Sequence, residues 1–132
     1  EVIIWGSGKP TREFIHADDI ADGCVFVMDL DFVELYKQGL THINVGTGSE
    51  TSIEKLVNLL STIIGYQGKI KYNESMPDGT PRKVMDVSRI NRLGWKHKIG
   101  LEDGLAMTYE SFAENRANKS VTKDSTFERQ II

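Results

Sequence analysis

Short runs of β-branched and apolar residues alternate with stretches of helical periodicity, and this alternation limits the folds open to the chain. The sequences VIIW at 2–5, THINVG at 41–46 and KIKY at 69–72 are each typical of a strand. Apolar residues over 53–64 recur every three or four positions, which predicts a helix that begins at TSIE and ends at Gly65. Strands that alternate with helices indicate a mixed α/β or α+β fold.

Three further helices are expected, which gives about four helices and few short strands in all. The first begins at Asp18 and Asp19, which would cap it, and its apolar face includes Cys24 as a small buried side chain. A short helix follows over 88–94, and a last one runs over 101–115. The sequence KVMDV, just before the short helix, is a candidate short strand.

The composition fits one soluble globular domain. The chain has 132 residues, of which 39% are hydrophobic and 27% charged, and its formal net charge of −3 argues against nucleic acid as a partner. No apolar stretch approaches the roughly 20 residues of a membrane span, and one cysteine cannot form an internal disulfide. A cytoplasmic protein is expected, with a folded part over 1–115 and a polar, disordered tail over 116–132.

Two glycine pairs invite a nucleotide-binding interpretation and fail its tests. Gly6 and Gly8 follow one strand, and Gly46 and Gly48 follow another, but neither pair has the third glycine of a dinucleotide fingerprint. A P-loop is also excluded, because Pro10 stands where the magnesium-binding hydroxyl should be. The glycines are therefore expected to shape turns.

Metal binding and catalysis find no support in the residues. His16, His42, His97 and Cys24 have no metal-ligand spacing, and no tyrosine is followed by lysine four positions later. No metal site and no catalytic set are expected in this chain.

Cations on turns are the remaining candidates. Arg12 follows the first glycine turn, Arg82 and Lys83 follow PDGTP, and Lys69 precedes a strand. Solvated surface charge is one interpretation of each. The other is a phosphate site, because arginine binds phosphate through two parallel hydrogen bonds and α/β proteins place ligands at loops after strands.

Four motifs, in this order and spacing, carry a family resemblance: WGSGKPTREFIHADD, HINVGTG, PDGTPRKVMDVSRINRLGW and LEDGLAMTY. They closely resemble the C-terminal part of bacterial GDP-L-fucose synthases, which are epimerase/reductases of the extended short-chain dehydrogenase family with a Rossmann-type fold. The resemblance covers residues 2–115. It implies that this chain is the C-terminal, substrate-binding part of such an enzyme.

In that family an N-terminal domain binds NADP and supplies the catalytic residues, so the resemblance implies that this piece alone is inactive. The complete enzyme, expected to be a homodimer, would epimerise C3 and C5 of GDP-4-keto-6-deoxy-mannose and reduce C4 with NADPH to give GDP-L-fucose. The resemblance further implies substrate contacts from Trp5, Arg12, Lys69, Arg82 and Lys83. Trp5 could instead belong to the core.

Two alternatives stay open from the sequence. A related enzyme of the same superfamily could act on another sugar, since sugar selection depends partly on residues outside this chain. A binding module without enzyme activity is the other.

Overall fold

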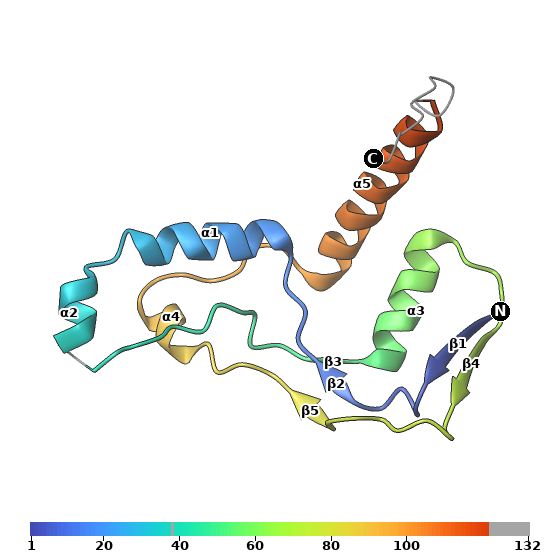
Figure 1. Ribbon diagram of the computed structural model, residues 1–132, viewed down its shortest axis with the longest axis horizontal. Coiled ribbons are helices and arrows are strands. Elements are labelled where there is room, and N and C mark those ends of the chain that lie inside the picture. Colours follow the sequence, from blue (N-terminus) through green and yellow to red (C-terminus); the bar gives the residue numbers. More distant parts are fainter. Residues whose placement is uncertain (38, 122–132) are drawn as a thin grey trace, which may run out of the picture.

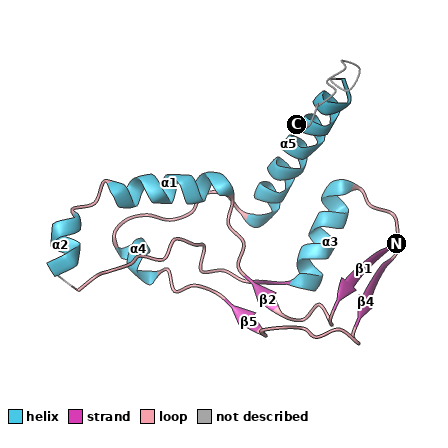
Figure 2. Ribbon diagram, viewed as in Figure 1, coloured by secondary structure: helices cyan, strands magenta, loops and turns pink. Residues whose placement is uncertain are grey.

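The structure is a computed structural model, and it describes residues 1–37 and 39–121. Helices and short strands alternate along the chain, as Figures 1 and 2 show. The elements are β1 (Val2–Trp5), β2 (Thr11–Arg12), α1 (Ala17–Met28), α2 (Phe32–Lys37), β3 (Thr51–Ser52), α3 (Ile53–Ile64), β4 (Ile70–Asn73), β5 (Arg82–Lys83), α4 (Ser88–Arg92) and α5 (Leu101–Val121). The predicted mixed α/β class is confirmed, and α2 is a helix that the sequence pattern did not reveal.

The strands form two small sheets. β1 pairs with β4 in parallel, while β2 lies between β3, to which it is antiparallel, and β5, to which it is parallel. In Figure 1, α1, α2 and α4 gather at one end of the molecule, and β1, β4 and α3 lie at the other. The β3-β2-β5 sheet therefore joins the two ends.

Helix α3 begins within the predicted TSIE and ends at the predicted Gly65, but the cap is Ser52 and not Thr51, the first residue of the predicted capping box. Ser52 is the N-cap, and its hydroxyl accepts a hydrogen bond from the Lys55 amide at 3.1 Å. Gly65 ends the helix in the left-handed conformation (φ 69°), which a residue without a side chain adopts without strain.

The buried core of the described residues is small and centres on α4. Val87, Ile90 and Trp95 form it, and Ile90 is completely buried. Gly23 of α1 lies directly against Trp95 and Val45, so a side chain at that position would collide with both. The absence of a Cβ lets α1 approach the core.

Helix α1 uses a different face and a different cap from those expected. Its N-cap is His16, whose Nδ1 accepts from the Asp18 amide at 3.2 Å, so the acidic pair does not cap the helix. Asp19 is instead 2% exposed, and its carboxylate accepts the amides of Lys98 and Ile99 at 3.0 and 2.9 Å. The buried carboxylate thus ties α1 to the segment before α5.

The expected burial of Cys24 is wrong, because its side chain is exposed. Ile20, Val25 and Met28, on the same side of α1, are 36%, 60% and 81% exposed. The helix is apolar around most of its circumference, and packing of Gly23 against Trp95 selects the other face. Periodicity alone does not distinguish two apolar faces.

Two predicted strands are not formed. Residues 41–46 pair with no other strand among the described residues, and Ile43 and Val45 pack on the core cluster instead. The candidate strand at 83–87 reduces to Lys83, the second residue of β5. A strand needs a neighbour for its backbone hydrogen bonds, and β2 is only two residues long.

Helix α5 is longer than expected, since it continues past 115 to Val121. Residues 116–121 contain no glycine or proline, so nothing in that sequence stops the helix. The remaining part of the expected tail, 122–132, lies outside the described residues. Within the described part of the chain, no helix is long and apolar enough to cross a membrane.

Candidate functional site

Arg12 and Lys83, two of the predicted site residues, lie side by side on neighbouring strands. In the parallel pairing of β2 with β5, Thr11 lies opposite Arg82 and Arg12 lies opposite Lys83. Successive side chains of a strand point to opposite faces, and directly opposed residues share a face. The register therefore places the two cations Arg12 and Lys83 on one face of the sheet.

The Arg12 guanidinium is held in place by backbone carbonyls. Its Nη1 donates to the carbonyl oxygens of Thr11 and Thr80, both at 2.7 Å. The side chain is half-buried. Nε and Nη2 have no hydrogen-bond partner among residues 1–37 and 39–121, so the fork keeps donors for a ligand while its direction is fixed.

The turn before β2 is fastened to the loop before β5. Ser7 donates through its amide and its hydroxyl to the Asp78 carboxylate, at 2.6 and 2.8 Å. These bonds, the amide bond first, hold the pKa of Asp78 below its ordinary value, and the charge of Lys9 acts in the same direction. Sequence reasoning did not single out Asp78, because its partner lies 71 positions away.

Trp5 lies at the end of β1, immediately before this turn, and is 70% exposed. The interpretation of Trp5 as a core residue is therefore wrong for this chain. An exposed indole combines a large apolar surface with one N–H donor, which suits packing on a sugar or a base.

Arg82 is directed elsewhere. Its Nε donates to the Glu50 carboxylate at 2.7 Å, and the Thr11 hydroxyl donates to the same oxygen at 2.9 Å. Thr11 is the register partner of Arg82, so this cluster belongs to the face opposite Arg12 and Lys83. The structure separates Arg82 from the neighbour with which it was grouped.

Lys69 is also separated from the other candidates. It precedes β4, and its carbonyl accepts the Val2 amide at 2.9 Å at the start of the β1–β4 pair. Trp5 pairs with Asn73 at the other end of that ribbon. Four residues of strand span about 13 Å, so the ribbon does not bring Lys69 to Trp5.

Glu13 is a residue that sequence reasoning missed. Its Oε1 accepts the amides of Thr47 and Gly48 at 2.5 and 2.9 Å, and its Oε2 accepts the Met85 amide at 2.7 Å. Partial burial works to raise the pKa of Glu13, but the donated hydrogen bonds of Met85, Gly48 and Thr47 outweigh it, and the pKa is lowered. The second glycine turn therefore binds a carboxylate of the chain itself.

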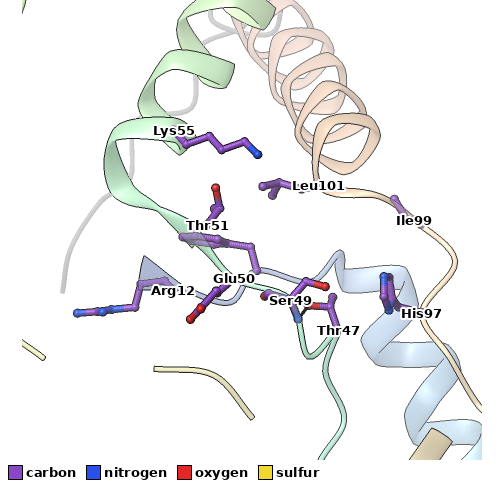
Figure 3. Close-up of a pocket in the computed structure, with 10 residues that line it drawn as sticks. Arg12, Thr47, Ser49, Glu50, Thr51, Lys55, His97, Ile99 and Leu101 are labelled. Atoms are coloured by element: carbon purple, nitrogen blue, oxygen red, sulfur yellow. Dashed lines mark hydrogen bonds between the residues drawn. The ribbon is translucent and has the colours of Figure 1, made fainter. Parts of the chain in front are cut away.

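A hollow of about 250 Å³ lies between the start of α3 and the segment before α5. Figure 3 shows Lys55 directed over it, whereas the Arg12 guanidinium points away from it. The first amides of α3 are not available to an anion there, because Ile53 and Glu54 donate to the carbonyls of Pro10 and Gly8 at 3.1 and 2.9 Å. Among the described residues no cluster of three histidine, cysteine or acidic side chains could hold a metal.

Comparison with known proteins bears directly on the resemblance. Residues 1–46 match the NAD dependent epimerase/dehydratase family. The probable GDP-L-fucose synthase 1 of Oryza sativa subsp. japonica is 49% identical over 115 residues, which are 87% of this chain and 33% of the rice protein. The resemblance to GDP-L-fucose synthases is confirmed. The chain spans about a third of the length of the curated relatives that it matches.

Solved structures agree with these relatives in fold. A GDP-6-OMe-4-keto-L-xylo-heptose reductase from C. jejuni superposes with a TM-score of 0.78 at 44% identity, over 86% of this chain and 34% of that one. The GDP-mannoheptose C4 reductase MlghC from Campylobacter jejuni, solved with NADP bound, superposes with a TM-score of 0.72 at 44% identity. The match covers 84% of this chain and 34% of the reductase. The chain therefore has the fold of the corresponding third of GDP-sugar reductases.

Proposed function

We propose that this chain is the GDP-sugar-binding region of a GDP-L-fucose synthase, with Arg12 and Lys83 as its diphosphate ligands and Trp5 as its contact to the sugar or base. The observation that carries the proposal is the register of β2 and β5, which puts two cations from distant motifs on one face. Two cations on one face suit a diphosphate, because charge-assisted hydrogen bonds are worth about 1.5–3 kcal/mol each.

The position of each residue supports its role. Arg12 is oriented by two carbonyls, Lys83 is exposed beside it, and Trp5 is exposed at the turn that leads to β2. Arg82, which is paired with Glu50 on the other face of the sheet, is assigned no contact with the ligand. Lys69, at the far end of the β1–β4 ribbon, is assigned no contact.

The complete protein is proposed to be a cytoplasmic homodimer whose N-terminal domain binds NADP and supplies the catalytic groups. It would convert GDP-4-keto-6-deoxy-mannose to GDP-L-fucose by epimerisation at C3 and C5 and reduction at C4. The support is the name of the rice relative and the NADP in the related C4 reductase. On this proposal the residues present here bind and orient substrate, and the chain alone has no activity.

A reductase for another GDP-sugar is the second candidate. Two heptose-related GDP-sugar reductases from Campylobacter jejuni are 44% identical to this chain, which is close to the 49% of the rice relative. Both candidates need the same diphosphate ligands and differ in the sugar. Turnover of GDP-4-keto-6-deoxy-mannose compared with GDP-4-keto-heptoses by the full-length protein distinguishes them.

The proposal is tested by Arg12→Ala and Lys83→Ala in the full-length protein. Each variant should bind the GDP-sugar about tenfold more weakly or worse, because one charge-assisted contact to the diphosphate is lost. NADPH affinity, measured on the same samples by fluorescence titration, should not change. Equal loss of both ligands, or loss of neither, would contradict the assignment.

A further inference from the structure

The two strands that bear the proposed diphosphate ligands are too short to fix their own register. β2 and β5 contain two residues each. Pairings of this length have few backbone hydrogen bonds, and even a complete two-stranded ribbon is marginally stable in water. A contact beyond the paired residues helps to keep Arg12 opposite Lys83.

Glu13 makes that contact. Glu13 directly follows Arg12, the last residue of β2. Its Oε2 accepts the amide of Met85, two residues after Lys83, at 2.7 Å. This bond continues the link between the two segments beyond the last paired residues. The carboxylate thus holds the segment after β5 next to the segment after β2, directly beyond the paired cations.

The same carboxylate also connects the end of β2 to the turn at Gly46–Gly48. Its Oε1 accepts the amides of Thr47 and Gly48, so one side chain links its own segment to two others. A Cβ added to Gly46 would collide with this oxygen. The absence of a side chain at Gly46 therefore leaves the space that the carboxylate occupies.

We propose that Glu13 is a positioning residue of the GDP-sugar site, which keeps Arg12 and Lys83 paired on one face for the diphosphate. The inference rests on the proposed function of those two residues. Glu13 itself touches no ligand and acts through the register of β2 and β5. A side-chain amide cannot replace the Glu13 carboxylate, because both carboxylate oxygens accept hydrogen bonds, from three backbone N–H groups in all.

The test is Glu13→Gln in the full-length enzyme, with Glu110→Gln, the same change at an exposed position of α5, as the control. Glutamine has the same shape but replaces one acceptor oxygen with a donor, so the bond to Met85 or those to the glycine turn are lost. GDP affinity should fall about tenfold, because the loss of one aligned charge-assisted contact has about this effect. NADPH affinity should not change, and E110Q should bind GDP as the unaltered enzyme does.

Addition of E13Q to the double variant R12A/K83A separates positioning from general damage. A positioning residue has no further effect on GDP affinity once the residues that it positions are gone. An unchanged affinity on this addition supports the proposal, and a further tenfold loss overturns it. If E13Q does not fold, Gly46→Ala displaces the same carboxylate and should weaken GDP binding, whereas Gly100→Ala should not.

The outcomes distinguish a failure of the positioning role of Glu13 from a failure of the proposed diphosphate site. If R12A and K83A weaken GDP binding and E13Q does not, the positioning role is wrong and the diphosphate site stands. If R12A and K83A have no effect on GDP binding, the proposed function itself fails.

Discussion

The turns at Gly6–Gly8 and Gly46–Gly48 look alike in sequence, and both bind a carboxylate of the chain. At the first turn, Ser7 alone supplies both donors, and the carboxylate of Asp78 lies at the surface. At the second turn, amides from two segments converge on the half-buried Glu13. The first turn joins two loops, and the second holds three segments together.

In both glycine turns the donors form an anion site, and tertiary structure decides which anion occupies it. Backbone N–H groups of such turns form a concave nest that favours negative charge. Here Asp78 and Glu13 fill the nests from 71 and 34 positions away. The more buried carboxylate, with more donors, is expected to contribute more to stability.

The largest effect is expected from Glu13→Ala. The change leaves the amides of Thr47, Gly48 and Met85 without their acceptor in a half-buried place, which should lower the free energy of unfolding by about 2–3 kcal/mol. Urea unfolding of the chain, followed by tryptophan fluorescence, measures it. A loss no greater than that of Asp78→Ala would remove the distinction between the two turns.

Gly46→Ala should follow in size, at about 1–2 kcal/mol, because the new methyl group collides with the Glu13 carboxylate and with Met85. Gly100→Ala is the matched control, since a Cβ there meets only Asp103 at an ordinary 3.7 Å. The two urea midpoints should differ clearly. Equal midpoints would mean that the space beside Glu13 is not needed.

Acid titration should separate the two carboxylates by the pH at which each is lost. Both have a pKa lowered in the folded state, so each stabilises the fold above its ordinary value and ceases to do so as the pH falls through the folded-state pKa. The loss should begin near the ordinary value of 4.5 for Glu13 and 3.8 for Asp78. Unfolding measured from pH 6 to 3, in steps of about half a unit, should show that E13Q removes the earlier and larger decline, whereas Asp78→Asn removes only a slight decline at lower pH.

The smallest effect is expected from Asp78→Ala, because water replaces an exposed carboxylate as the acceptor for Ser7. Stability should change little, while the turn between Trp5 and Arg12 loses its tie to the β5 loop. Amide hydrogen exchange at Ser7 should become faster without a change at Thr47. Slower or unchanged exchange at Ser7 would contradict the tie.

Local signals allowed part of this fold to be predicted from the sequence. The cap at Ser52, the periodicity over 53–64 and the stop at Gly65 are all encoded within a few residues, and α3 follows them. The face of α1 was not predictable in this way, because burial depends on the approach of Trp95 to Gly23 from a distant segment. Strands of two residues leave no periodic pattern at all.

In the candidate site too, local motifs reveal some residues and only the tertiary structure reveals the others. Arg12 and Lys83 were found through motifs, yet their common face follows from a register that only the structure gives. Arg82 is adjacent to Lys83 in sequence and lies on the other face for the same reason. Glu13 and Asp78 were missed because a carboxylate that binds distant amides has no local signature.

Calorimetric titration of GDP into the full-length protein, compared between Arg12→Ala and Arg82→Ala, tests the central claim most directly. Both variants remove one arginine from the same sheet, but only Arg12 shares a face with Lys83, whereas Arg82 is paired with Glu50. The account predicts that R12A weakens GDP binding about tenfold or more and that R82A stays within about twofold. Equal weakening by both variants, or a greater loss in R82A, would contradict it.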